Sequence, residues 1–170
     1  MKIQILISKS SWADSYKKLI KYKLKNLSNK LIFLNNHKKL IKRYDVNIIF
    51  SYFKKIDKNS LVKSKYNIIP HESNLPQGRG MSPLTWQILK GKDNVVFSLI
   101  EASTKIDDGS IYYKKNVFFK RDLTFSEIKK IQLENNIFLI QKFLKFIKQN
   151  KKSPKKFKQI GKRSYYKKRT

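Results

Sequence analysis

The central stretch of the chain, residues 68–91, reads Ile68-Ile-Pro-His-Glu-Ser-Asn-Leu-Pro-Gln-Gly-Arg-Gly-Met-Ser-Pro-Leu-Thr-Trp-Gln-Ile-Leu-Lys-Gly91. It contains three of the four prolines, three of the five glycines and one of the two histidines in the sequence. Glycine permits unusual backbone dihedrals, and proline fixes φ and removes a backbone donor. A loop of closely specified shape is therefore predicted here, and long shaped loops in compact domains usually carry function.

Apolar runs on both sides of this loop alternate with segments of helical pattern. Short apolar runs predict strands at residues 3–8, 31–34, 46–50, 67–69, 94–100 and 111–118. Between the first two runs a helix is expected to reach about Asn26, from a capping-box-like start at Ser11 and Asp14. This spacing predicts an α/β fold with a doubly wound, mostly parallel sheet.

Two further helices are predicted after the central loop. Pro83 begins the first of them, and Gly91 is placed to end it. The second starts at a capping box formed by Thr124 and Glu127 and keeps an apolar stripe to about Asn150. The chain is thus expected to end its folded part in a long helix.

The composition bounds the function without deciding it. The 170 residues suit one domain, and the absence of cysteine excludes disulfides and thiolate metal sites. The net charge of +29 invites a nucleic-acid partner. However, only five of the 40 basic residues are arginine and the lysines are dispersed, which favours a compositional bias. No apolar run suits a membrane span or a signal peptide, so a cytoplasmic location is the default expectation.

The last twenty residues differ from the rest of the chain. Residues 1–150 are predicted to form the catalytic domain, and residues 151–170 form a Lys/Arg-rich tail with Phe157, Tyr165 and Tyr166 interleaved. This tail is expected to be flexible, and contact with RNA or an anionic substrate is a second interpretation. The oligomeric state is not indicated by the sequence.

Two places in the sequence are candidates for acid–base chemistry. His71 is expected at the carboxyl end of a strand, where open α/β sheets bind ligands, and imidazole titrates near neutrality. His37 lies among Asn and Lys residues and is interpreted as a surface residue. Asp107 and Asp108 precede Gly109, so they form either a turn between two strands or a carboxylate facing His71.

Several other kinds of site lack their sequence patterns. The dinucleotide motif Gly-x-Gly-x-x-Gly is absent after the first predicted strand, and so are a Walker motif, a serine nucleophile elbow and a cluster of metal ligands. No metal is therefore expected. The remaining chemistry is one in which a His and an Asp manage a proton transfer while a backbone-rich loop fixes two substrates.

Two segments together resemble a known family. Residues 71–88 are similar to the folate-dependent formyltransferase signature His-x-Ser-Leu-Leu-Pro-x-Tyr-Arg-Gly-x-x-Pro, and residues 106–111 are similar to its Val/Ile-Asp-x-Gly-x-Ile motif. They occur in the family's order, and the resemblance covers most of residues 1–150. It implies a Rossmann-like formyltransferase fold, with 10-formyltetrahydrofolate as formyl donor.

The resemblance also implies roles for individual residues. His71 matches the catalytic histidine, which stabilises the oxyanion, and Asp107 matches the catalytic aspartate, which holds that histidine or a relay water. The positions implied to bind the folate are Tyr52, Phe53, Lys54, Ile56, Thr104 and Ile106. Those implied for the substrate loop are Ser73, Leu75, Pro76, Arg79 and Gly80.

The chain departs from the family two residues before His71. Ile69 stands where formyltransferases usually have an asparagine that donates to the formyl oxygen, so either Asn74 or a backbone amide replaces it, or the activity is reduced. Loss of one such donor lowers a rate by roughly 10²–10³. Amino-sugar formyltransferases, with the pattern Val/Ile-x-His-x-Ser-Asp-Leu-Pro-x-Gly, resemble this sequence more closely.

The acceptor follows from the branch that the chain resembles. Methionyl-tRNA formyltransferases carry an additional C-terminal domain, whereas this sequence stops at Thr170, which disfavours a tRNA acceptor despite the charge. Glycinamide ribonucleotide is a further alternative. The favoured acceptor is a small-molecule amine on a nucleotide-linked amino sugar. The competing hypothesis is an RNA-binding protein built on a formyltransferase domain that has lost its activity.

Overall fold

The computed structural model describes residues 1–168. The larger sheet contains β1 (Lys2–Leu6), β2 (Lys30–Leu34), β3 (Tyr44–Ile49), β4 (Ser64–His71), β6 (Asn94–Glu101) and β7 (Ile111–Phe118). A second, two-stranded sheet contains β5 (Arg79–Gly80) and β8 (Tyr165–Tyr166). The helices are α1 (Lys17–Leu24), α2 (Lys58–Leu61), α3 (Pro83–Leu89) and α4 (Phe125–Asn150). Three short 3₁₀ turns, η1 (Trp12–Tyr16), η2 (Lys25–Leu27) and η3 (His37–Lys39), complete the elements.

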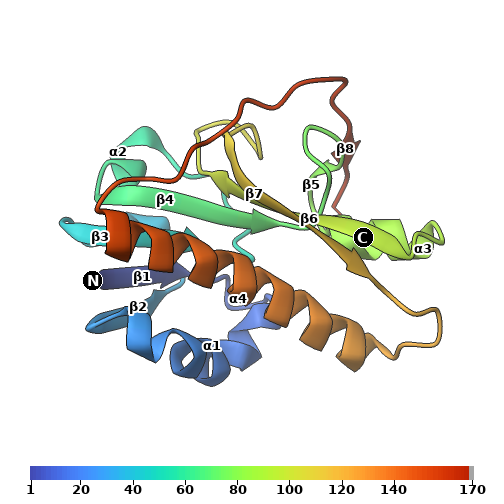
Figure 1. Ribbon diagram of the computed structural model, residues 1–170, viewed down its shortest axis with the longest axis horizontal. Coiled ribbons are helices and arrows are strands. Elements are labelled where there is room, and N and C mark those ends of the chain that lie inside the picture. The colour runs from blue at the N-terminus through green and yellow to red at the C-terminus, as the bar shows by residue number, and fades with distance from the viewer. Residues whose placement is uncertain (169–170) are drawn as a thin grey trace.

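The large sheet has the strand order β2-β1-β3-β4-β6-β7 (Figure 1). Its first four strands are parallel, and β6 and β7 are added in antiparallel register. The predicted doubly wound, mostly parallel sheet is therefore confirmed. In β4 the pairing places His71 opposite Ser98 of β6, at the point where the sheet changes from parallel to antiparallel.

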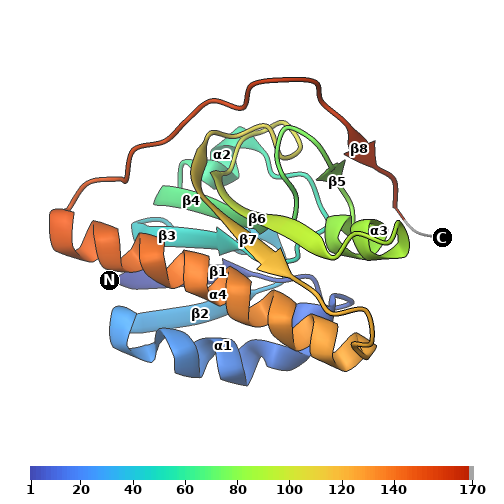
Figure 2. The same cartoon turned by 45° about the vertical axis from the view of Figure 1, so that its right-hand side comes forward.

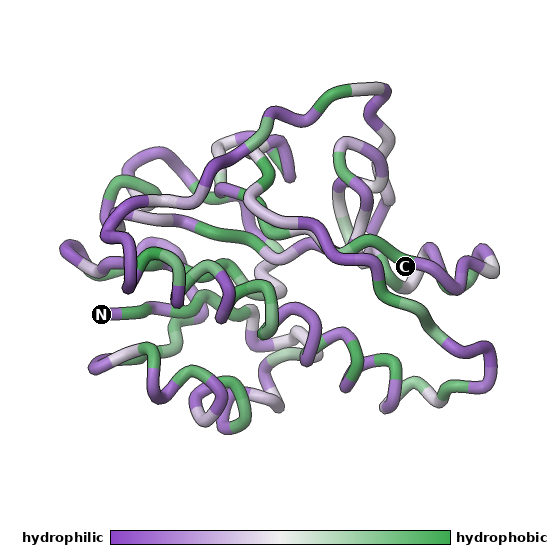
Figure 3. Tube along the Cα trace, viewed as in Figure 1, coloured by the Kyte–Doolittle hydropathy of each residue, from purple (hydrophilic) through white to green (hydrophobic). Residues whose placement is uncertain are grey.

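Each face of the sheet has its own apolar cluster. In and just after β1, Ile3, Ile5 and Ile7 point to the face covered by α1 and α4, and Leu6 points to the opposite face. This alternation is the period-2 pattern of a strand, and it appears because both faces of a central strand are covered. Green segments of high hydropathy accordingly lie within the sheet, and green and purple alternate along α4 (Figure 3).

The long final helix crosses the whole sheet and fixes it from one side. The predicted capping box is present, since Thr124 Oγ1 accepts from the Glu127 backbone N–H and the Glu127 carboxylate accepts from the Thr124 N–H at 2.7 Å. Phe143, in the C-terminal half of α4, is fully buried against Tyr66 and Tyr112. Truncation of such a phenylalanine to alanine costs about 3–5 kcal/mol.

The first helix starts differently from the prediction. Ser11 makes no capping hydrogen bond, and η1 precedes α1, which begins at Lys17. The reason is local, because the Asp14 carboxylate pairs with Lys17 Nζ at 2.5 Å instead of reaching back to the backbone of Ser11. The expected end of the pattern near Asn26 agrees with η2, which follows α1 directly.

The tail after α4 packs on the domain along residues 151–168. It leaves the end of α4, crosses above the sheet and comes down beside β5 and α3 (Figures 1 and 2). Phe157 pairs with Ile111, and β8 pairs with β5. This pairing with β5 and with Ile111 of β7 is made by the backbone, so it requires no hydrophobic period in the sequence of the tail. Within the described part of the chain, no helix is long and apolar enough to cross a membrane.

Candidate active site

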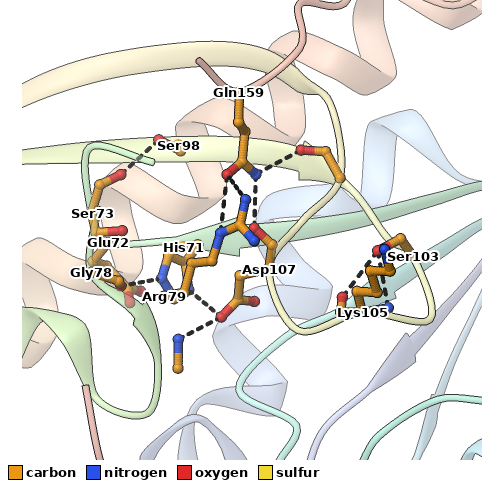
Figure 4. Close-up of polar contacts among 12 residues, drawn as sticks. His71, Glu72, Ser73, Gly78, Arg79, Ser98, Ser103, Lys105, Asp107 and Gln159 are labelled. Atoms are coloured by element: carbon orange, nitrogen blue, oxygen red, sulfur yellow. Dashed lines mark hydrogen bonds and ion pairs between the residues drawn. The ribbon is translucent and has the colours of Figure 1, made fainter. Parts of the chain in front are cut away.

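His71 is the last residue of β4 and is buried at the carboxyl end of the parallel strands. Its Nε2 lies 2.9 Å from the backbone oxygen of Gly78 (Figure 4). A carbonyl oxygen only accepts, so Nε2 carries the hydrogen and donates it. This contact fixes the orientation of the ring and leaves Nδ1 for chemistry.

Asp107 faces that second nitrogen. Its Oδ2 lies 3.7 Å from Nδ1 of His71 and accepts a 2.8 Å hydrogen bond from the backbone N–H of Gly80. The residue has φ +47°, in the left-handed region that Asp tolerates better than most residues. Of the two interpretations of this Asp-Asp-Gly segment, the structure therefore supports a carboxylate aimed at His71. Its neighbour Asp108 instead pairs with Arg79 at 2.6 Å.

This arrangement suits a single proton transfer. With Nε2 committed to Gly78, a proton gained by the ring goes to Nδ1, where the Asp107 carboxylate stabilises the resulting imidazolium. Side chains of both residues are largely buried, at 6% and 13% exposure, so water screens their interaction little. The pair can therefore act as an acid–base group or as a cationic donor to a developing oxyanion.

A pocket of about 260 Å³ opens in front of the pair. One part of the lining, which we call the apolar end, comes from β3 and from the loops after β3 and β6, and it includes Ile49, Tyr52, Phe53, Ile56, Ala102 and Ile106. A second part, which we call the polar end, includes Trp12, Glu72, Lys129, Gln132 and Asn136, and the last four of these are joined by hydrogen bonds. His71, Asp107, Gly80 and Ile69 also line the pocket.

All six residues implied to bind the folate line this pocket: Tyr52, Phe53, Lys54, Ile56, Thr104 and Ile106. They come from two loops, one after β3 and one after β6. Both β3 and β6 pair with β4, which lies between them, and this explains why positions some 50 residues apart meet in space.

The first of these loops is held by a small polar network. The Tyr52 hydroxyl lies 2.8 Å from Nδ1 of His37, and Nε2 of His37 lies 3.2 Å from the Asp57 carboxylate. The backbone N–H of Ser60, followed by its hydroxyl, lowers the pKa of Asp57. His37 is therefore not an isolated surface residue, as its sequence context suggested, but a partly buried support for Tyr52.

Most residues of the predicted substrate loop do not line the pocket. Ser73, Leu75 and Pro76 are buried and do not line it. Arg79 is 2% exposed and is held by Asp108 and Gln159, so its guanidinium shapes the loop from inside. Of this set only Gly80 reaches the pocket wall.

Asn74, one of the two expected replacements for the missing amide donor, lies elsewhere. Its side chain is exposed and outside the pocket, and its Oδ1 accepts from Lys114 Nζ at 2.6 Å. The structure thus does not bring Asn74 together with His71. Ile69, in contrast, does line the pocket.

Four polar residues of the pocket were not found from the sequence. Glu72 is buried, and its Oε1 accepts from Gln132 Nε2 at 2.8 Å and from Asn136 Nδ2 at 2.6 Å. Lys129 Nζ in turn donates to Gln132 Oε1 at 2.8 Å. The signal was present in α4, where polar residues at 129, 132 and 136 follow helical spacing within an otherwise apolar stripe.

Comparison with known proteins places this geometry in context. No protein-family model matches the sequence. The chain is 31% identical over 109 residues to the bifunctional polymyxin resistance protein ArnA of Wigglesworthia glossinidia brevipalpis, and 29% identical over 113 residues to methionyl-tRNA formyltransferase of Clostridium perfringens. These matches cover 61% and 66% of this chain. The chain is a relative of the folate-dependent formyltransferases.

The formyltransferase fold is confirmed by a solved structure. The formyltransferase PseJ of Anoxybacillus kamchatkensis, in complex with UDP-4,6-dideoxy-4-formamido-L-AltNAc and tetrahydrofolate, superimposes with a TM-score of 0.74 at 17% identity. The superposition covers 98% of this chain and 85% of PseJ. By contrast, the chain spans 16% of the length of ArnA and 37% of the methionyl-tRNA formyltransferase.

Proposed function

We propose that this formyltransferase relative transfers a formyl group from 10-formyltetrahydrofolate to a primary amine of a nucleotide-linked amino sugar. The observation that carries the proposal is the pairing of His71 with Asp107 at the wall of the pocket, with the ring fixed by Gly78 and the carboxylate by Gly80. The pair meets the geometric requirement for proton management beside a bound carbonyl.

The apolar end of the pocket fits the formyl donor. Its flat apolar walls, from Tyr52 and Phe53 on one loop and Ile106 on the other, suit a fused ring system. Three lysines at the same end, Lys54, Lys55 and Lys105, suit carboxylates further along such a ligand. When bound, 10-formyltetrahydrofolate supplies the carbonyl carbon that the acceptor amine attacks.

The residues of this chain then have separate tasks. Nδ1 of His71 would take the proton that the attacking amine loses, donate it in a hydrogen bond to the oxygen that gains charge, and pass it to the folate nitrogen when the bond from that nitrogen to the formyl carbon breaks. Asp107 stabilises the protonated ring. Ile69 offers no donor, so in this proposal His71 provides most of the stabilisation of the oxyanion.

The polar end of the pocket supports an acceptor rich in hydrogen-bond donors. Glu72 presents a carboxylate there, oriented through Oε1 by the amides of Gln132 and Asn136. Hydroxyl groups and the amine of a sugar are suitable partners for it. The bound nucleotide sugar named in the PseJ structure, a protein that this chain covers over 85% of its length, favours the same class of acceptor.

A tRNA acceptor is the second candidate. It is favoured by the similarity to methionyl-tRNA formyltransferase and by the net charge of +29, because neutralising phosphates releases counterions. The two acceptors differ in salt dependence. Turnover of a macromolecular polyanion falls steeply between about 50 and 200 mM salt, whereas turnover of a nucleotide sugar changes much less.

The test is release of tetrahydrofolate from 10-formyltetrahydrofolate in the presence of a panel of amino-sugar nucleotides, with initiator methionyl-tRNA as a parallel acceptor. His71→Ala is expected to abolish turnover, and Asp107→Asn is expected to lower it by about 10²–10⁴. Asp45→Asn is a matched control, because Asp45 also accepts a backbone N–H, that of Lys2 at 2.6 Å, and it does not line the pocket. Absence of turnover with every amine, together with tight and salt-sensitive RNA binding, would show a binding protein instead.

A further inference from the structure

Gln159, in the tail after α4, bridges the segment that follows His71 and the loop that carries Asp107. Its Nε2 donates to the backbone oxygen of Asp107 at 2.7 Å and to that of Gly109 at 2.8 Å. Its Oε1 accepts from Arg79, from Nε at 3.2 Å and from Nη2 at 2.5 Å (Figure 4). One amide thus satisfies four polar groups, two on each loop.

The same tail holds the backbone on which His71 and Asp107 depend. Ser164 accepts from the Gly78 N–H through its hydroxyl at 2.8 Å and from the Arg79 N–H through its backbone oxygen at 2.9 Å. Gly78 is the residue whose oxygen accepts from His71, and Gly80 is the residue whose N–H donates to Asp107. The tail therefore contacts the segment that orients both catalytic side chains.

Close packing shows that this contact needs glycine. A Cβ on Gly80 would lie 2.4 Å from the backbone oxygen of Tyr166, and Gly80 also has φ +95°. Tyr166 stacks on Trp86 of α3 with ring centroids 6.3 Å apart, and Trp86 Nε1 donates to the backbone oxygen of Lys167 at 3.0 Å. The tail therefore contacts β7, the segment after β4, the loop after β6, and α3.

We propose that Gln159 is a positioning residue for the catalytic pair, and that residues 157–167 form a strap that completes the active site. Without the Gln159 amide, the carbonyls of Asp107 and Gly109 lose their donor and the Arg79 guanidinium loses its second partner, so the loop that presents Asp107 shifts relative to His71. The expected loss of activity rests on the proposed function, whereas the expected shift of the Asp107 loop relative to His71 does not.

The experiment uses the full chain with Gln159→Ala and, as matched control, Gln141→Ala. Gln141 also donates from Nε2 to a backbone oxygen, that of Lys23 at 2.8 Å, and lies outside the pocket. Histidine labelled with ¹⁵N gives side-chain signals from only two residues, His71 and His37. We expect Gln159→Ala to shift the ring nitrogen signals of His71, to leave those of His37 in place, and to lower kcat about 10- to 100-fold, since small misplacements of a catalytic group have effects of this size.

A second variant covers the case in which Gln159→Ala does not fold. Gln159→Glu keeps an acceptor for Arg79 but replaces the donating amide by a carboxylate oxygen that faces the carbonyls of Asp107 and Gly109, and it is expected to shift the His71 signals as well. Unchanged His71 signals in a folded variant would overturn the inference. A wild type that turns over no amine, but whose His71 signals still depend on Gln159, supports the positioning role and overturns the proposed function alone.

Discussion

Asp107 Oδ2 lies 3.7 Å from His71 Nδ1, and both groups are largely buried at the wall of one pocket. A carboxylate at this distance stabilises the charged imidazole, and an amide in its place does not. Asp107→Asn is expected to lower kcat by about 10²–10⁴ with little change in the KM of the formyl donor. Asparagine also tolerates the left-handed backbone at this position, so the fold should be kept. Steady-state kinetics beside Asp45→Asn would measure this, and a kcat within about threefold of the wild type contradicts the role.

Ile69 lines the pocket two residues before His71, at the position where the family resemblance implies an asparagine donor. Ile69→Asn adds a side-chain N–H at the place where the oxyanion forms. One preorganised donor is worth about 10²–10³ in kcat, so an increase of at least tenfold is expected in single-turnover rates.

Ile69→Leu is the control for this change, because it keeps the volume and adds no donor. Thermal unfolding of both variants should show that the faster single-turnover rate of Ile69→Asn does not come from a more stable fold. If Ile69→Asn folds and is no faster than the wild type, a donor other than the one lost already serves the formyl oxygen.

The sequence was most informative where the chemistry depends on local patterns. His71 could be placed at a strand end and Asp107 in a motif, since strand ends and Asp-Gly turns have short-range signals. The six folate positions were implied by the family resemblance, and all of them line one pocket. The Asp107 carboxylate faces Nδ1 of His71, and not solvent, because the sheet brings their strands together. This orientation cannot be inferred from the spacing of the two residues along the chain.

Two features of the structure could not be predicted from the sequence, each for a different physical reason. The tail packs through its backbone, Gln159 and a single stacked ring. None of these contacts requires a hydrophobic period, so the sequence of the tail shows only its basic composition, from which flexibility was expected. Asn74 was one of the two expected replacements for the missing donor. In the structure its side chain turns out of the loop to Lys114, away from the pocket.

Glu72 offers a prediction for the acceptor. Glu72→Gln retains an oxygen for the amides of Gln132 and Asn136 but removes the charge that faces the polar end of the pocket. We expect the KM of the acceptor to rise about tenfold or more, as for loss of a charge-assisted hydrogen bond, while the affinity for tetrahydrofolate stays the same.

Isothermal titration with tetrahydrofolate and initial rates at varied acceptor concentration separate these two effects. Glu134→Gln is the matched control, because Glu134 is an exposed glutamate of α4, the helix that carries Gln132 and Asn136. Equal loss of affinity for both ligands would mean that Glu72 supports the pocket as a whole and does not recognise the acceptor.

The capping box of α4 gives a prediction for the dependence of stability on pH. The Thr124 hydroxyl, followed by the Thr124 backbone N–H, lowers the pKa of Glu127 from its usual value of 4.5. A carboxyl group with a lowered pKa in the folded state stabilises the fold above its usual pKa, and this contribution is lost as the pH falls through the folded value. Glu127→Gln should therefore have a lower Tm than the wild type at about pH 7, and the two Tm values should converge by about pH 3, where both side chains are neutral. Thermal unfolding followed by circular dichroism measures this, with Glu134→Gln as control. A difference in Tm that is the same at both pH values would show that the shape of the side chain at Glu127, and not its charge, begins the helix.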